Sequence, residues 1–425
     1  MIREDFLHYL WRTRRLESTN LQSTEGEPIQ ILQPGIYNTD SGPDFTNARI
    51  RIGDTTWAGN VEMHLRASDW PTHGHQHDRA YDNVILHVVL EEDQPVLRPN
   101  GERIPCLELK NLTPPRLSAF YLQLIDNEHW IPCQHHFYQV AELTKTMWLE
   151  RLLVERMAQK TDAFEQMLAQ TGQDWEAAFY QALARGFGVR INAEPFELLA
   201  KSTPLRTLLK HKNNLLQLEA LLFGQAGLLA NDFSDAYPRQ LQKEYAHLQH
   251  KYSLTPIRGE SWKFMRLRPA AFPTVRIAQF AMLLFQSAHL FSKVLAASNV
   301  TELENMFELK LSNYWLSHYV FDKESPKSRK NLGKSAIQLL IVNTVAPFVF
   351  LYGRLRAAQH YQDRALQWLQ QLPPERNHII DKWQTLGVSV HSAHDTQALL
   401  QLKNEYCDRK RCLECAIGNV VLKNC

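Results

Sequence analysis

The fold of this protein is decided by residues 42–66, GPDFTNARIRIGDTTWAGNVEMHLR. Apolar and polar residues alternate along 47–52 and again through the second half of the stretch, and Gly53-Asp54 turns the chain between them. Side chains two residues apart on a strand project to the same face, so Glu62 and His64 point together. The stretch therefore predicts two neighbouring β-strands that carry polar side chains on one face.

The segments on either side extend this sheet. Residues 1–15 place apolar side chains at helical spacing and predict a helix, and residues 29–32 predict a short strand. Residues 83–90, NVILHVVL, are nearly all apolar, as in a strand buried on both faces. A hairpin is expected over 96–109, turned at Asn100-Gly101. Together these segments predict an α/β domain with a mixed sheet and flanking helices.

The pattern changes in the second part of the chain, where helical spacing dominates and strand signals are few. The expected helices cover 147–170, 174–184, 204–222, 274–297, 333–355 and 359–369. A chain of 425 residues is also too long for one simple core. We therefore expect the α/β domain over 1–140, a mainly α-helical domain over 141–400 and a cysteine-rich tail over 401–425.

The composition is that of an ordinary globular protein, with 44% hydrophobic and 22% charged residues. Residues 1–15 contain charged side chains throughout and lack the apolar core of a signal peptide. The most apolar stretch, 336–352, is short for a membrane span and contains Gln338, Asn343 and Pro347, so it predicts a buried helix. We expect a cytoplasmic protein without a membrane segment.

Two acidic residues of the strand region form a candidate metal site. Asp44 begins one predicted strand, and Glu62 follows on the next after seventeen intervening residues. Carboxylates that converge from neighbouring strands bind a hard cation such as Mg²⁺ or Mn²⁺. Such a cation can activate water and stabilise the charge that develops when a phosphodiester is cleaved. The spacing therefore favours metal-dependent phosphodiester hydrolysis.

The motif Pro43-Asp44 followed by Glu62-Met63-His64 resembles the PD-(D/E)XK nuclease superfamily over residues 1–92, including the order of the predicted elements. The resemblance implies that Asp44 and Glu62 are catalytic metal ligands and that Glu4, on the first helix, is an additional acidic ligand. His64 stands where the superfamily has lysine. A histidine can act as a base or a metal ligand near neutral pH, and it shifts the metal preference toward Mn²⁺.

Two functions follow from this resemblance. The first is a nuclease-like enzyme that acts on DNA or RNA. The alternative is a catalytically inactive module of the same fold that binds nucleic acid, since His64 is not a fixed cation as lysine is.

A second group of candidate ligands is the run His73, His75 and His77, with His87 on the following strand. Alternate histidines can chelate a transition metal, which would make the protein a histidine-cluster metal hydrolase. The plainer interpretation is a polar loop that borders the carboxylate site. A third alternative is a structural scaffold that binds neither metal nor nucleic acid.

Cysteines crowd into the end of the chain, at Cys407, Cys412, Cys415 and Cys425. Their spacing predicts a structural Zn²⁺ site or an iron–sulfur cluster. Some members of the resembled superfamily carry an iron–sulfur cluster whose fourth ligand lies far upstream. That resemblance implies Cys106 or Cys133 as an alternative to Cys425.

The chain is nearly neutral, with a net charge of +2, but residues 258–276 and 323–334 are locally basic. Nucleic acid is therefore the expected partner. The first segment mixes basic residues with Trp262, Phe264 and Phe272, as phosphate-binding and base-stacking surfaces do. Solvated helix faces are the alternative. The candidate nucleic-acid ligands are Arg258, Lys263, Arg266, Arg268, Arg276, Lys330 and Lys334.

The whole chain is also similar to an uncharacterised bacterial family of about this length. The segments that carry the resemblance are LHYLW (7–11), GPDF (42–45), NVEMH (60–64), YDNVILHVV (81–89), RPAAFPTVRIAQ (268–279) and KRCLECAIG (410–418). This resemblance implies one coherent architecture and no particular activity.

Overall fold

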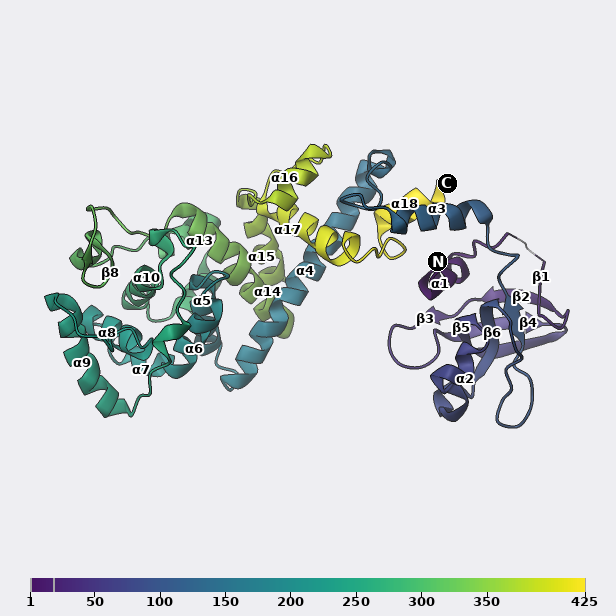
Figure 1. The fold of residues 1–425 in the computed structure, drawn as a ribbon, viewed down its shortest axis with the longest axis horizontal. Coiled ribbons are helices and arrows are strands. Elements are labelled where there is room, and N and C mark those ends of the chain that lie inside the picture. The colour runs from purple at the N-terminus through teal and green to yellow at the C-terminus, as the bar shows by residue number, and fades with distance from the viewer. Residues whose placement is uncertain (1, 18–19, 425) are drawn as a thin grey trace. The chain divides into compact units, whose positions relative to one another are not determined.

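The computed structural model describes residues 2–17 and 20–424 and divides the chain into two compact units. The first unit contains Met1–Trp148 together with Leu402–Cys425, and the second contains Leu149–Gln401. The chain has a mixed sheet in its N-terminal part and is mostly helical after it, as the sequence predicted at this level (Figure 1).

The first unit is built on a seven-stranded sheet with the order β1-β2-β4-β5-β6-β7, in which β3 pairs with β4. The pairs up to β4 and β5 are antiparallel, whereas β5, β6 and β7 run parallel. The strands are β1 (Leu21–Gln22), β2 (Pro28–Gln33), β3 (Ile36–Tyr37), β4 (Phe45–Ile52), β5 (Thr55–Arg66), β6 (Val84–Glu91) and β7 (Cys106–Glu108).

The local sequence explains the central strands. Side chains of β4 alternate between buried and exposed, and Gly53, with a φ of 57°, makes the turn into β5. Six consecutive residues of β6, from Val84 to Val89, are buried, because both faces of this parallel strand are covered. Helix α1 (Glu4–Thr13) packs its apolar stripe against β5, while α2 (Asp69–His73), η1 (His75–His77) and η2 (Arg79–Tyr81) connect β5 to β6.

The end of the chain packs into this first unit and does not form a separate tail. Arg12 donates to the carbonyl of Leu413 at 3.3 Å, and Arg15 donates to the carbonyl of Leu422 at 2.7 Å. Lys410 donates to the carbonyl of Ile125. The helical elements involved are α3 (Pro115–Asp126), η3 (Phe137–Gln139), the start of α4 (Glu142–Gln170), η8 (Leu402–Cys407) and α18 (Ala416–Lys423).

The hairpin expected over 96–109 is present only at its tip. Leu97 and Arg103 form an isolated bridge around the Asn100-Gly101 turn. The N–H of Ile104 also donates to the carbonyl of Val96 at 2.9 Å, and beyond Ile104 the strand β7 pairs in parallel with β6. The prediction was therefore wrong for the second strand of the hairpin.

The second unit is helical around one large apolar core, with the short pair β8 (His318–Val320) and β9 (Lys323–Glu324). After α4 it contains α5 (Trp175–Phe187), α6 (Ala193–Ser202), α7 (Leu205–Leu209), α8 (Leu215–Gln225), α9 (Ala236–Tyr252), η4 (Gly259–Ser261), η5 (Pro269–Ala271), α10 (Pro273–Gln286), α11 (Leu290–Ala296), α12 (Val300–Met306), η6 (Asn313–Leu316), α13 (Lys334–Leu340), η7 (Ile341–Val345), α14 (Ala346–Leu355), α15 (Gln359–Gln371), α16 (His378–Thr385) and α17 (Ala393–Gln401).

Within the described residues, one helix is long and apolar enough to cross a membrane, Lys334–Leu355. Its most apolar window has a mean hydropathy of 1.7, yet 72% of that window is buried inside the protein. A wide π-type turn at η7 precedes Pro347, which has no N–H to donate to an ordinary helical ladder. The helix thus forms part of the core of the second unit.

Candidate metal centre

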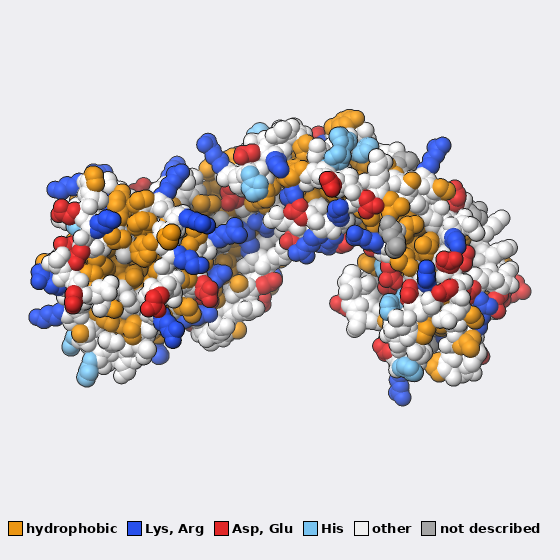
Figure 2. Space-filling model, viewed as in Figure 1, with side chains coloured by type: hydrophobic (Ala, Val, Ile, Leu, Met, Phe, Trp, Pro, Cys, Tyr) orange, Lys and Arg blue, Asp and Glu red, His pale blue; other side chains and the backbone are white. Residues whose placement is uncertain are grey.

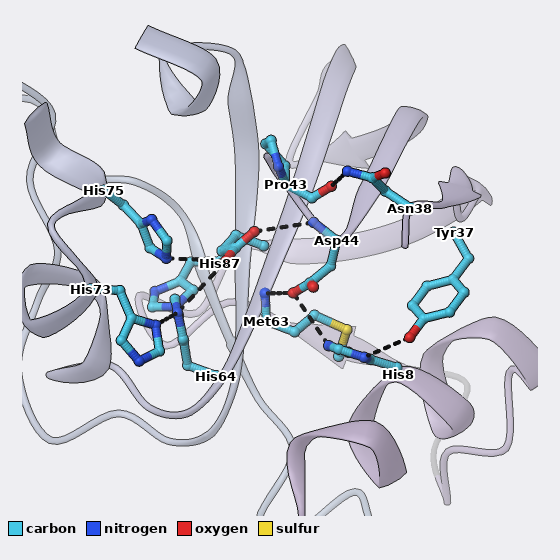
Figure 3. A network of polar contacts seen from close by, with 11 residues as sticks. His8, Tyr37, Asn38, Pro43, Asp44, Met63, His64, His73, His75 and His87 are labelled. Atoms are coloured by element: carbon cyan, nitrogen blue, oxygen red, sulfur yellow. Dashed lines mark hydrogen bonds and ion pairs between the residues drawn. The ribbon is translucent and has the colours of Figure 1, made fainter. Parts of the chain in front are cut away.

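Polar side chains from five elements of the first unit meet beside the middle of its sheet. They come from α1, the start of β4, β5, the α2–η1 segment and β6. His64, His73 and His75 point toward one another, while His8 approaches Asp44 beyond Met63 (Figure 3). Residues that are up to about eighty positions apart in the chain thus form one site.

The carboxyl groups of Asp44 and Glu62 lie next to each other, as their predicted roles require. The backbone N–H of Asp44 donates to Glu62 Oε2 at 3.1 Å, and Asp44 Oδ2 accepts from the backbone N–H of Met63 at 2.9 Å. Each carboxylate is therefore held by the backbone beside the other. Glu62 is 5% exposed, whereas the side chain of Asp44 is 23% exposed, so the pair lies between the interior and the solvent.

Helix α1 brings two further groups to Asp44. His8 Nε2 lies 3.2 Å from Asp44 Oδ2, and His8 Nδ1 lies 3.4 Å from the hydroxyl of Tyr37. Burial, followed by the charge of Asp44, raises the pKa of Glu4 to about 7. Glu4 is therefore near the carboxylates, where the resemblance placed it. His8 has the same orientation because residues four apart share a helix face.

The histidines form a compact cluster on the other side of Glu62. One ligand atom from each of His64, His73 and His75 lies within 4.8 Å of the others, the spacing expected around a metal ion. His64 Nε2 is 3.2 Å from His73 Nδ1. Glu62 Oε1 is 3.3 Å from His75 Nε2 and 3.6 Å from His64 Nε2, so the carboxylate and the imidazoles adjoin.

His87 supports this cluster from β6. Its Nε2 lies 2.8 Å from His64 Nδ1, and the side chain is completely buried. The contact leaves His64 Nε2 facing His73 and Glu62. Sequence analysis named His87 only as a neighbour of the histidine run, although a lone polar residue in the apolar strand 84–90 was a signal for such a contact.

Burial controls the charge states in the centre. It raises the pKa of Glu62 to about 9, with the nearby charge of Asp44 as the next cause. It lowers the pKa of His64 to about 2 and that of His87 to about 3, with neighbouring histidines adding to the effect. His64 is therefore a neutral imidazole at neutral pH and cannot replace the cationic lysine of the nuclease motif as a charge.

Among the contacts that Asp44, Glu62 and His64 make with described residues, none involves a lysine or an arginine. Two adjacent carboxylates, one of them buried, are electrostatically unfavourable without a fixed cation. A divalent cation would offset their charge and accept the neutral imidazoles as further ligands. The donor set thus fits a metal ion of intermediate softness.

The surroundings of the cluster are aromatic on one side. Tyr81 stacks on His75 with 3.9 Å between ring centroids, and Trp70 meets the same ring edge-on at 5.4 Å. A hollow of about 280 Å³ opens beside them, with Arg98 and Asn100 in its lining. His77, the third member of the predicted run, is exposed and lies outside the cluster of described ligands.

The structure also shows which of the predicted cysteines lie together. Cys407, Cys412 and Cys415 lie in the first unit, where Cys133 joins them, whereas Cys425 lies outside the described residues. Cys106 belongs to β7 and interacts with Glu92. None of the five cysteines in the described part of the chain forms a disulfide.

The predicted nucleic-acid ligands of the second unit are only partly available. Lys330 is 3% exposed and donates to the carbonyl of Leu316 at 2.8 Å, so it stabilises the interior. Arg276 is half-buried, and burial lowers its pKa to about 10. The exposed candidates are Arg258, Lys263, Arg266, Arg268 and Lys334, the last of which lies 3.7 Å from Glu304.

The aromatic residues between these basic groups are not stacking platforms. Trp262 is buried and donates to the carbonyl of Ala226 at 2.8 Å, and Phe264 packs edge-on against Phe272. On the visible face of the helical unit, Lys and Arg side chains are scattered among hydrophobic ones (Figure 2). Base stacking by this segment is therefore not supported.

Comparison with known proteins gives one match. No curated protein and no solved structure is significantly similar to this chain. A family model matches residues 4–378, which span the sheet, the candidate metal centre and most of the helical unit. The chain therefore belongs to the family described as "Protein of unknown function (DUF2851)".

Proposed function

We propose that this protein is a metal-dependent hydrolase of phosphodiester bonds in nucleic acid. The observation that carries the proposal is the convergence of the Asp44 and Glu62 carboxyl groups with the imidazoles of His64, His73 and His75 beside one sheet. Carboxylates and histidines arranged in this way are typical of centres that hold a catalytic divalent metal.

The arrangement of elements supports a nuclease of the PD-(D/E)XK type. A helix precedes the sheet, Asp44 begins one strand, Glu62 and His64 share the next, and a helical connection leads to a parallel strand. In this proposal the superfamily's lysine is lost and the α2–η1 segment supplies two extra histidines. The centre therefore belongs to a histidine-rich variant of the nuclease site.

The ligands favour Mn²⁺ or Zn²⁺ over Mg²⁺, because imidazole suits the former two and Mg²⁺ prefers oxygen ligands and water. Glu62 and the three histidines would hold the ion, with Asp44 beside them. The bound ion would lower the pKa of water and polarise a phosphoryl oxygen. His87 keeps Nε2 of His64 directed toward the centre, as partners behind metal-binding histidines commonly do.

Glu4 is the candidate proton acceptor. Its pKa of about 7 matches a general base that works at neutral pH, and the charge of Asp44 is one cause of that value. A carboxylate with this pKa holds a proton for part of the time at pH 7 and can both accept and release one. In this proposal Glu4 acts as a base beside the carboxylate pair, and its role as an additional metal ligand stays a prediction.

The exposed basic residues Arg258, Lys263, Arg266 and Arg268 are proposed to contact phosphates without reading sequence. They follow one another on a short irregular segment of the second unit. Removing these residues should weaken the binding of nucleic acid equally for all sequences. It should also make the binding less sensitive to salt.

A second candidate function is hydrolysis of a small substrate at the same centre. The close spacing of His64, His73 and His75, together with the aromatic hollow beside His75, favours it. The two candidates share the metal and differ in the substrate, so substrate screening separates them.

The test uses the full-length protein, stripped with chelator and then loaded separately with Mn²⁺, Zn²⁺ or Mg²⁺. Binding is measured by calorimetry, and cleavage with labelled single- and double-stranded DNA and RNA and with bis(p-nitrophenyl) phosphate. Glu62→Gln and Asp44→Asn should weaken Mn²⁺ binding and abolish cleavage, whereas the matched variant His77→Gln should retain both. Cleavage of the small diester alone would favour the second candidate.

The proposal fails if the stripped protein binds none of the three metals, or if cleavage persists in an Asp44→Asn, Glu62→Gln double variant. Binding of metal and nucleic acid without cleavage would leave only the inactive binding module.

A further inference from the structure

Four cysteines from two distant parts of the sequence meet in the first unit. Cys133 lies between α3 and α4, whereas Cys407, Cys412 and Cys415 belong to the last part of the chain. Cys133, Cys412 and Cys415 are buried, and Cys407 is intermediate in exposure. None of them contributes to the centre around Glu62, and this inference does not rest on the proposed function.

The segment that carries Cys133 lies against the last part of the chain, because Lys410 donates to the carbonyls of Ile125 and Asn127 and Lys403 lies 5.2 Å from the ring centroid of Trp130. Every pair of the four thiols also interacts electrostatically. Burial first, and then the charges of Cys133, Cys415 and Cys412, raise the pKa of Cys407 well above its usual value. Burial, followed by Cys133 and Cys415, likewise raises the pKa of Cys412, and the pKa of Cys133 rises to about 12 with Cys415 as the second cause. The cysteines therefore form one group.

The loops that carry the cysteines are folded tightly around the group. Lys410, with a φ of 53°, turns the chain after Cys407, and its N–H donates to the carbonyl of Cys407 at 3.1 Å. A Cβ atom on Gly418 would collide with the carbonyl oxygen of Cys412, so only glycine permits this approach. The positions of Cys407 and Cys412 are thus fixed by backbone geometry.

Several hydrogen-bond donors surround the sulfur of Cys415. Cys415 precedes α18, and the backbone N–H groups of Ile417 and Gly418 donate to its sulfur, as does the side chain of Trp148. Burial raises the pKa of Cys415, and these donors reduce that rise. Hydrogen bonds to sulfur are the usual support of cysteine ligands in metal centres.

The arrangement of the cysteines in the sequence indicates what the group can hold. Four sulfurs around a single Zn²⁺, with Zn–S bonds of about 2.3 Å in a tetrahedron, would lie about 3.8 Å apart. Among the described residues, the one group of three or more potential ligand atoms within 4.8 Å of one another is His64, His73 and His75. The four cysteines are not part of such a group, and the order Cys407-x4-Cys412-x2-Cys415 with one distant cysteine matches a known spacing of iron–sulfur ligands.

We propose that Cys133, Cys407, Cys412 and Cys415 bind an iron–sulfur cluster. In such a cluster the thiolates bind different iron atoms. Cys133, one of the two predicted upstream alternatives to Cys425, is the fourth ligand in this proposal, whereas Cys106 lies on β7 beside Glu92. The cluster would link the last part of the chain to the segment between α3 and α4.

The first test needs no variant. The full-length protein is purified without oxygen, and iron, acid-labile sulfide and zinc are measured per chain, together with the visible absorption spectrum and the electron paramagnetic resonance spectrum after dithionite reduction. We expect iron and sulfide in stoichiometric amounts, with a visible absorption band. Stoichiometric zinc without sulfide would overturn the cluster, and protein that contains none of these metals would overturn the site.

The second test assigns the ligands. Cys133→Ser should lower the iron and sulfide content at least about fivefold, whereas Cys106→Ser and Cys425→Ser should leave it unchanged. Circular dichroism of each variant reports whether the second unit stays folded. Loss of iron in Cys425→Ser with full retention in Cys133→Ser would refute the proposed ligand set.

Discussion

At the scale of single residues, His87 orients His64 in the candidate metal centre. Its Nε2 lies 2.8 Å from His64 Nδ1 in a completely buried position. His87→Leu removes this contact, and we expect Mn²⁺ binding to weaken by roughly 10–100-fold, as for other partners behind metal-binding histidines. His87→Gln, which keeps a hydrogen-bonding group, should recover part of the affinity. Equal affinities of wild type and His87→Leu in calorimetry would show that the contact has no orienting role.

Glu219 of the second unit gives a pH-dependent prediction that is independent of any metal. It is 2% exposed, and burial raises its pKa from 4.5 to about 7, although hydrogen bonds from Tyr237 and Trp315 oppose the shift. Because the folded pKa is raised, the folded state holds a proton that the unfolded chain has released. Stability is therefore lost as the pH rises from about 4.5 to 7.

Glu219→Gln removes that loss. We therefore expect the free energy of unfolding of the variant to exceed that of the wild type by roughly 1–3 kcal/mol at pH 8 and to be nearly equal to it at pH 4.5. Denaturant unfolding at the two pH values measures the difference. Glu260→Gln, at an exposed position, is the matched control. A gain in stability that is the same at both pH values would contradict a buried, protonated Glu219.

The candidate site was predictable only where neighbours in sequence determine neighbours in space. The spacing of Glu62 and His64 on one strand fixed their common orientation, and Asp44 followed from the adjoining strand. The positions of His8 and Cys133 depend on how α1 packs on β5 and where the chain end docks, neither of which a local pattern contains. Lys330 shows the reverse case, since a basic run does not reveal that one of its members is buried.

At the scale of elements, the periodic patterns located helices and strands but not their interruptions. The helix expected over 204–222 is broken after α7, because Asn214 caps the start of α8 by accepting from the N–H of Gln217. The helix expected over 274–297 is likewise divided into α10 and α11. The parallel pairing of β7 with β6 could not be read from alternation, since the partner of a strand is decided by the tertiary fold.

Gly59 is the point at which β5 approaches the chain before β6 most closely. A Cβ atom there would lie 2.6 Å from the carbonyl oxygen of Asn83 and would also collide with Ile85. That carbonyl accepts from the N–H of Asn60 at 2.8 Å, so it cannot move away without breaking the ladder. We expect Gly59→Ala to destabilise the first unit by about 1–3 kcal/mol.

Thermal unfolding monitored with a probe in each unit measures this effect. Gly333→Ala is the matched control, because a Cβ atom at Gly333 meets nothing within 4 Å and its φ is ordinary for a helix cap. Equal melting temperatures for the two variants would show that the strands can separate at Gly59 at little cost.

At the scale of the whole molecule, the first unit is assembled from both ends of the chain, whereas the second is one continuous segment. Helix α4 carries the chain out of the first unit, and η8, directly after α17, brings it back. A continuous segment with its own apolar core can fold without the rest of the chain. A unit that is completed by distant residues cannot be complete until the whole chain is present.

This difference predicts opposite results for two truncations. The fragment 149–401 should fold alone, with helical circular dichroism and a cooperative thermal transition, because its core cluster is made from its own residues. A chain that ends at Gln401 should keep this second unit but lose the acceptors of Arg12 and Arg15, namely the carbonyls of Leu413 and Leu422. Helix α1, which carries Glu4 and His8 beside Asp44, would then be held less firmly.

Hydrogen exchange measures the consequence residue by residue. In the chain that ends at Gln401, amides of α1 should exchange at least about tenfold faster than in the full-length protein, while amides of α8 and α10 should be unchanged. An Arg12→Ala, Arg15→Ala variant of the full chain is the control, and it should reproduce part of the effect on α1. Unchanged protection of α1 in the truncated chain would mean that the sheet alone holds this helix and that residues 402–425 are not needed to complete the metal centre.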